Sequence, residues 1–118
     1  MQKYVAVPRS LAQIQAQVSY FLGTLVTVFH VLTLTYVQPL DVVDQTRPAH
    51  VEWIKKEIEA GRLLLAGRQE SEKGGVLITG DITVEAAEEL IANDPYQLAG
   101  LVSYERVGFN AALRAPGL

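Results

Sequence analysis

The sequence contains no cysteine, and this excludes several kinds of site at once. Without a thiol there is no disulfide, no thiolate nucleophile and no metal site built on sulfur. The lack of cysteine also fits the reducing cytoplasm, because disulfides stabilise mainly the proteins of oxidising compartments. We therefore expect a cytoplasmic protein whose stability depends on its hydrophobic core.

Positive charge is also scarce, with 10 Lys and Arg residues against 13 Asp and Glu residues and a formal net charge of −3. No cluster of basic residues provides the stripe that binds a nucleic-acid backbone. Gly74 and Gly75 are typical of a turn and not of a phosphate cradle, because neither a helix nor Gly-Lys-Ser follows them. We expect no nucleic-acid partner and no nucleotide site.

Histidine is rare as well, and the two residues, His30 and His50, lie in different predicted elements. No group of histidines and carboxylates has the spacing of metal ligands. We therefore expect neither a metal nor another cofactor.

The stretch "VSYFLGTLVTVFHVLTLTYV", twenty residues from 18 to 37, contains no Asp, Glu, Lys or Arg. A helix of this length would cross a bilayer. Its four threonines and five valines favour a soluble domain containing a strand. Lys3 and Arg9 precede the stretch as in a signal peptide, but no small-x-small cleavage site follows. We expect no membrane insertion, with an anchor formed by residues 1–29 as the alternative.

Residue types that alternate with a period of two predict the strands. The segment "HVLTLTYV" predicts a strand over 30–37. The segments "RLLLAGRQES" and "GGVLITGD", at 62–71 and 74–81, predict a hairpin because the turn signal "SEKGG" joins them. The segment "LVSYERVGF" predicts a last strand over 101–109, with Val102, Tyr104 and Arg106 on one face.

Apolar residues at steps of three and four predict two helices. We expect the first helix to begin at Pro48, where a missing N–H costs nothing, and to stop at Gly61. We expect Thr83 to cap the second helix, which must end before Pro95. The predicted apolar faces are Ala49, Trp53, Ile54 and Ile58 in the first helix and Ala87, Leu90 and Ile91 in the second.

The order strand, helix, strand, strand, helix, strand predicts an α+β fold of the split βαβ type over residues 30–110. Four antiparallel strands then carry both helices on one face. A small domain with an uncovered apolar sheet face buries it most simply against a second copy, so we expect a homodimer.

The remaining residues form extensions at the two ends. Leu11, Ile14 and Val18 have helical spacing, and this predicts a helix within residues 1–29 that Ser10 caps and Gly23 ends. The segment "TLVTVF" after Gly23 would extend the first strand. An incorrect start site, which would make this segment a loose tail, is the alternative. Residues 111–118 are a C-terminal tail.

Acid/base chemistry has one candidate pair, His50 in "TRPAHVEW" and Asp94 in "NDPY". A carboxylate that accepts a hydrogen bond from one imidazole nitrogen fixes the tautomer and raises the basicity of the other nitrogen. The spacing in the sequence does not establish that the two side chains meet. In the alternative reading, His50 is a surface residue of a helix and Asp94 forms a turn before Pro95.

Five segments resemble the YciI-like family, also described as the YCII-related domain: "RPAHVEWI", "GRLLLAG", "GGVLI", "EAAEELIANDPYQLAGL" and the last strand. The resemblance covers about residues 31–109. It implies a ferredoxin-like fold, assembled as a dimeric α/β barrel, and a dyad that maps onto His50 and Asp94.

One departure from the family changes the charge near the expected pocket. Members commonly read "AGP" where this chain reads "AGR", so Arg68 replaces a proline. Arg68, like the nearby Arg47, could bind an anionic substrate, or it could simply be solvated. The hydroxyl groups of Tyr36 and Tyr96 could likewise reach the pocket or serve packing alone.

Two functions fit these features. The first is a cofactor-independent enzyme of small-molecule metabolism in which His50 transfers protons, Asp94 orients it, and Arg47 or Arg68 binds an anionic or phenolic group. Elimination, isomerisation and hydrolysis all suit such a dyad. The second is a non-catalytic module that binds a small ligand or partner in the same cleft.

Overall fold

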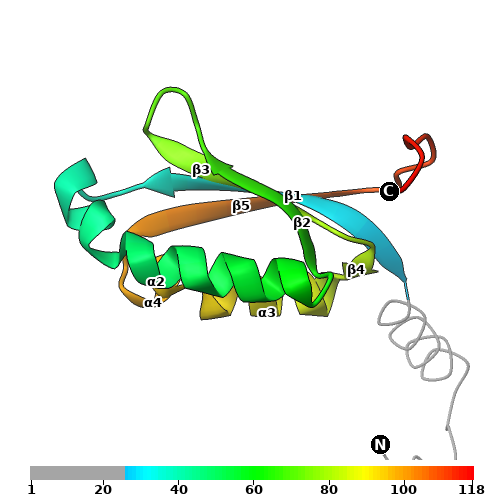
Figure 1. Cartoon of the computed structure of the whole chain (residues 1–118), viewed down its shortest axis with the longest axis horizontal. Coiled ribbons are helices and arrows are strands. Elements are labelled where there is room, and N and C mark those ends of the chain that lie inside the picture. Colours follow the sequence, from blue (N-terminus) through cyan, green and yellow to red (C-terminus); the bar gives the residue numbers. More distant parts are fainter. Residues whose placement is uncertain (1–25) are drawn as a thin grey trace, which may run out of the picture.

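The computed structural model describes residues 26–118, so the predicted helix between Ser10 and Gly23 lies outside the described residues. Over this part of the chain, one antiparallel sheet carries three helices on one face (Figure 1). In chain order the elements are β1 (Thr27–Tyr36), α2 (Leu40–Glu59), β2 (Leu63–Arg68), β3 (Gly74–Thr79), β4 (Ile82–Thr83), α3 (Val84–Asn93), α4 (Pro95–Leu98) and β5 (Val102–Phe109).

Strand β1 lies at the centre of the sheet, paired with β3 on one side and β5 on the other. Strand β2 pairs with β3, which confirms the predicted hairpin. The two-residue strand β4 pairs with Thr27 and Val28 and was not predicted. The predicted α+β class with an antiparallel sheet is correct, and β1 begins at Thr27, ahead of the expected His30.

The core lies between the helices and the inner face of the sheet. Leu32 and Leu34 of β1 and Leu77 of β3 point inward, as the alternation of their strands requires. His30 is also fully buried there. Its Nε2–H donates to the carbonyl of Ile82 at 3.0 Å, so Nδ1 accepts from Arg106 at 3.2 Å. Both ring nitrogens are therefore satisfied within the fold.

The predicted start of the first helix at Pro48 is wrong, because α2 begins eight residues earlier at Leu40. Pro48 lies inside the helix, where proline costs about 3 kcal/mol and removes a hydrogen bond. Val43 is fully buried in the core, and burial of one such side chain contributes about 1.5–3 kcal/mol. Packing of this magnitude offsets the cost of Pro48. Figure 1 shows the first turns of α2 bent away from the rest of the helix.

The inward face of α2 also differs from the predicted stripe. Trp53 and Ile54 are partly buried as expected, but Ala49 and Ile58 are exposed. Val43 and His50 are the buried residues of this helix. The predicted stripe leaves out His50 because histidine is a polar residue type, although its side chain lies in the protein interior.

The ends of both long helices agree with the prediction. Helix α2 ends at Glu59, and Gly61 follows in the left-handed region with φ of 81°. The hydroxyl oxygen of Thr83 accepts from the N–H of Ala86 at 3.0 Å and so caps α3. Helix α3 ends at Asn93, before Pro95. No helix of residues 26–118 is long and apolar enough to cross a membrane.

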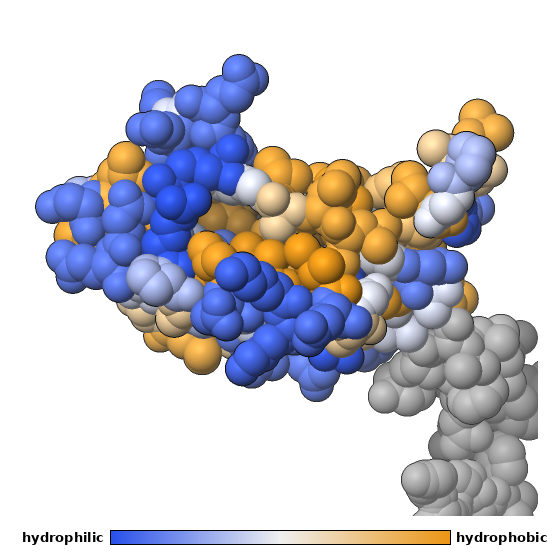
Figure 2. Space-filling view, viewed as in Figure 1, coloured by the Kyte–Doolittle hydropathy of each residue, from blue (hydrophilic) through white to orange (hydrophobic). Residues whose placement is uncertain are grey.

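The outer face of the sheet is largely apolar. The pairing register places four aliphatic side chains in one row across the four long strands: Leu65, Ile78, Val31 and Val107. Val107 is 61% exposed and Leu65 is 66% exposed. Figure 2 shows hydrophobic surface along this side, between the β2–β3 turn and the C-terminus.

Candidate active site

His50 and Asp94 meet in the structure. The Nδ1 atom of His50, on α2, lies 2.7 Å from Oδ1 of Asp94, at the junction of α3 and α4. A carboxylate only accepts hydrogen bonds, so Nδ1 carries the proton and donates it. His50 is 7% exposed and Asp94 has no exposed surface. The pair is therefore a buried hydrogen bond between side chains 44 residues apart in the sequence.

The chain around Asp94 holds its carboxylate in place. Asp94 ends α3 and caps α4, where Pro95 occupies the first helical position. Its Oδ1 accepts from the backbone N–H of Tyr96 at 2.9 Å, and its Oδ2 accepts from the hydroxyl of Tyr104 at 2.5 Å. With the bond from His50, the carboxylate accepts three hydrogen bonds, which compensate for the burial of its charge.

Aromatic rings hold the imidazole of His50. The ring of Tyr96 stacks on it with centroids 3.8 Å apart and planes 12° apart, and the ring of Trp53 lies 5.8 Å away. Because Nδ1 is a donor, Nε2 of the neutral ring carries a free lone pair. Among the residues that the structure describes, none forms a hydrogen bond to Nε2. This nitrogen is therefore available to accept a proton.

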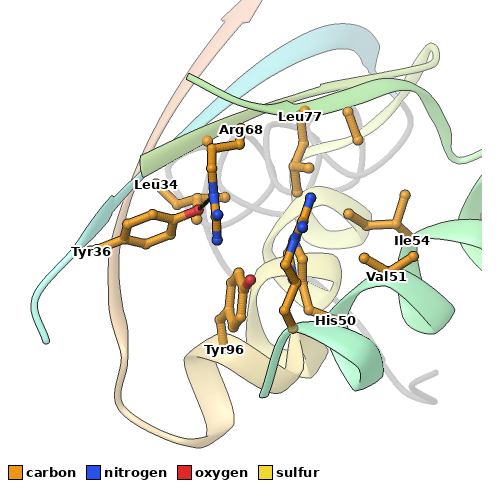
Figure 3. Close-up of a pocket in the computed structure, with 12 residues that line it drawn as sticks. Leu34, Tyr36, His50, Val51, Ile54, Arg68, Leu77 and Tyr96 are labelled. Carbon is orange, nitrogen blue, oxygen red and sulfur yellow. Dashed lines mark hydrogen bonds between the residues drawn. The ribbon is translucent and has the colours of Figure 1, made fainter. Parts of the chain in front are cut away.

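His50 lines a pocket of about 170 Å³ between α2, α4 and the inner face of the sheet. Figure 3 shows the side chains that converge on this pocket. The apolar lining comes mainly from Leu34, Val51, Ile54 and Leu77, and the polar lining from Tyr36, Arg47, His50, Arg68 and Tyr96. All the predicted site residues except Asp94 line the pocket directly. Across residues 26–118, no three His, Asp or Glu side chains gather as metal ligands.

Arg68 lies at the end of β2 with its guanidinium already paired. Its Nη2 donates to Oδ1 of Asp44 at 2.5 Å, and its Nε donates to the hydroxyl of Tyr36 at 2.9 Å. These two hydrogen bonds raise the pKa of Arg68 above its ordinary value. Asp44 was not among the predicted site residues, because its segment was expected to precede the helix.

Tyr36 and Tyr96, which both line the pocket, pack edge to face with ring centroids 6.0 Å apart and planes at 84°. Both hydroxyls point toward Arg68 in Figure 3. Burial raises the pKa of Tyr96, so its hydroxyl stays protonated and able to donate at neutral pH. Arg47 is exposed at the pocket rim.

The comparisons with known proteins place the chain in a family. The model of the YCII-related domain matches residues 28–108. The chain belongs to the YCII-related domain family. The match confirms the resemblance given by the sequence motifs and includes both His50 and Asp94.

Two further proteins resemble this YCII-related domain. A "12 kDa protein" of Mycolicibacterium smegmatis is 87% identical over 23 residues, which are 20% of this chain and 96% of that sequence. The solved structure of a 5-chloro-2-hydroxyhydroquinone dehydrochlorinase from Burkholderia phenoliruptrix, in complex with 2,5-dihydroxybenzoquinone, matches with a TM-score of 0.59 and 16% identity. That match covers 70% of this chain and 93% of the other, and at this identity it shows a shared fold.

The Asp44 carboxylate competes with any anion for Arg68. Substitution of Asp44 by Asn removes this charge, and we expect an anionic ligand in the pocket to bind roughly three- to tenfold more tightly. Isothermal titration calorimetry with a phenolate or carboxylate that binds the wild type would measure the change. Weaker binding to the variant would mean instead that Asp44 is needed to hold Arg68 in place.

Proposed function

We propose that this YCII-related domain is a cofactor-independent enzyme in which His50 acts as the general base and Asp94 orients it. The hydrogen bond from His50 Nδ1 to Asp94 carries the proposal, because it leaves Nε2 as a proton acceptor at the pocket. General acid–base catalysis needs this arrangement of an oriented imidazole next to a space for the substrate.

In this mechanism, Nε2 takes a proton from a hydroxyl or an acidic C–H of the substrate. The buried carboxylate of Asp94 stabilises the imidazolium that forms. The electron pair released on the substrate then expels a leaving anion, or the proton returns at another carbon. In a hydrolysis, water is the group that loses the proton. Elimination, isomerisation and hydrolysis are therefore all within reach of the same dyad.

The size and lining of the pocket favour a small ring with ionisable substituents. A cavity of about 150 Å³ accepts benzene, so about 170 Å³ fits one ring with few substituents. Leu34, Ile54 and Leu77 supply apolar contacts, and Arg47 and Arg68 supply positive charge. The dehydrochlorinase of similar fold was solved with a dihydroxybenzoquinone, and this supports hydroquinones and related phenols as the first substrates to try.

A spectrophotometric assay tests the proposal. Purified protein would be mixed with a panel of halogenated hydroquinones under anaerobic conditions, and the loss of hydrogen halide that forms the quinone would be followed. Unsubstituted hydroquinones, which have no halide to lose, are the controls. We expect turnover that saturates with substrate and is lost when His50 is replaced. Ligand binding without turnover of any compound would instead favour the non-catalytic binding module.

We further propose that the domain has the ferredoxin-like topology and forms a homodimer, the dimeric α/β barrel that the family resemblance implies. The pairing order β5, β1, β3 and β2, with the helices on one face, supports this topology. The apolar row from Leu65 to Val107 supports a second copy as the occupant of the outer face. Burial of such a row contributes about 25 cal/mol for each Å² of apolar surface.

An aspartate in the apolar row of this face should break the dimer. We expect the wild type to sediment as a dimer at micromolar concentration and Val107→Asp to sediment as a monomer, because the dimer would bury an unpaired charge. Analytical ultracentrifugation measures both. Leu98→Asp is the control, since Leu98 is 72% exposed on α4, away from the outer face. A monomeric wild type would contradict the proposed assembly.

A further inference from the structure

The carboxylate of Asp94 binds a second side chain besides His50. Tyr104, on β5, faces inward opposite Leu34, and its hydroxyl donates to Oδ2 of Asp94 at 2.5 Å. Oδ1 is occupied by the N–H groups of His50 and Tyr96. The two oxygens of the carboxylate are therefore held by donors from three different elements, α2, α4 and β5.

Tyr104 does not line the pocket and so does not touch a ligand there. Its ring lies between Asp94 and a shallow hollow on the other side of the domain, which Tyr104 lines together with Glu88, Ile91, Gln97, Val102, Ser103 and Arg106. Asp94 has no exposed surface even though this hollow is open. The ring thus covers the carboxylate on that side, and the hydroxyl fixes its orientation.

We infer that Tyr104 is a positioning residue of the proposed active site, which sets the basicity of His50 through the hydroxyl that it donates to Asp94. The inference rests on the proposed function of the His50 and Asp94 pair. A hydrogen bond to an ionised carboxylate withdraws negative charge from it, so Asp94 attracts the proton of His50 less strongly while Tyr104 donates.

The hydroxyl of Tyr104 can donate to Asp94 throughout the neutral pH range. Burial, and next the charge of Asp94, raise the pKa of Tyr104 well above its ordinary value. The group therefore stays protonated, and as the partner of a carboxylate it can only be the donor. The sequence pattern groups Tyr104 with Val102 and Arg106 on one face of its strand, but nothing in the pattern links it to Asp94.

Several other charged or titratable groups surround His50 and influence the same proton. They are Arg47 on α2, Tyr36 on β1, Arg68 on β2, Tyr96 on α4, and Asp94 with Tyr104 behind it. A test of Tyr104 must therefore leave these groups unchanged. Tyr104→Phe does so, because it keeps the ring that covers Asp94 and removes only the hydroxyl.

The experiment is an NMR titration of the imidazole of His50 in the full chain, labelled with ¹⁵N-histidine. We expect Tyr104→Phe to raise the pKa of His50 by about half a unit to one unit. Ser103→Ala, the neighbour whose side chain points to the other face of β5, should leave this pKa unchanged. Once a substrate is known, the variant should lower kcat more than it changes KM. An unchanged pKa in Tyr104→Phe would overturn the inference.

A second variant separates this inference from the proposed function. Asp94→Asn removes the charge itself, and we expect it to lower the pKa of His50 by about one unit or more. If Asp94→Asn acts in this way and Tyr104→Phe has no effect, only the role of Tyr104 is lost. If Asp94→Asn also has no effect, the dyad fails and both proposals are overturned.

A measurement on the wild type covers the case in which Tyr104→Phe does not fold. With ¹³Cζ-labelled tyrosine, we expect the resonance of Tyr104 to move with the same midpoint as the titration of His50, because the shared carboxylate couples the two groups. A Tyr104 resonance that does not shift when His50 is protonated would contradict the inference.

Discussion

Replacement of His50 by Gln should lower kcat/KM by about 10²–10⁴-fold, the usual contribution of a positioned general acid or base. The glutamine amide can still donate to Asp94 and fill much of the imidazole volume, but it cannot accept a proton at neutral pH. The loss should therefore fall on kcat, with a smaller change in KM. Steady-state kinetics on a hydroquinone that the wild type converts would measure both constants.

The second histidine of the chain provides the control. His30 is fully buried, but both of its ring nitrogens are used within the fold and it does not line the pocket. We expect His30→Gln to lower the free energy of unfolding and leave kcat of the folded protein near the wild-type value. Equal loss of kcat in both variants would show that the effect of His50→Gln is structural.

Replacement of Asp94 by Ala should cost about 3–5 kcal/mol of the free energy of unfolding, because three donors lose their acceptor and each unsatisfied buried group costs about 1–3 kcal/mol. The hydroxyl of Tyr104, the Nδ1–H of His50 and the N–H of Tyr96 all lose their acceptor, a carboxylate with no exposed surface. Domains of this size are commonly stable by only 5–15 kcal/mol. Urea denaturation followed by circular dichroism would measure the shift in midpoint.

Asp44→Ala is the matched control for this stability change. Asp44 is also a hydrogen-bonded carboxylate, with the cationic Arg68 as its donor, but its side chain is 43% exposed. Exposed pairs of this kind contribute about 0–1 kcal/mol. We therefore expect the free energy of unfolding of Asp44→Ala to be close to that of the wild type. A similar small change for Asp94→Ala would mean that the buried carboxylate is not held as the structure describes.

The periodicity of the sequence was sufficient for most of the fold. Alternation in β1 and β5 and the "SEKGG" turn between β2 and β3 predicted these strands and the hairpin, because one buried face imposes a period of two. The start of α2 was not predictable in this way. Pro48 is a strong local signal for a helix start, whereas the burial of Val43 that extends the helix depends on contacts with distant strands.

The candidate site was only partly predictable for a similar reason. The chemistry of His50 and Asp94 and the family motifs suggested the pair, but the separation of 44 residues could not establish a contact. Tyr104 and Asp44 have no motif of their own. Tyr104 reaches Asp94 because β5 pairs with β1, and Asp44 reaches Arg68 because α2 starts early and packs beside β2. Both are consequences of tertiary structure.

The most direct test of the proposed dyad is the tautomer of His50, observed by ¹⁵N NMR of the imidazole rings above their pKa values. We expect His50 to carry its proton on Nδ1, with Nε2 unprotonated, because Asp94 accepts at Nδ1. We expect the opposite tautomer for His30, whose Nε2–H donates to the carbonyl of Ile82. A neutral His50 protonated on Nε2 would leave no base at the pocket and would contradict the proposed mechanism.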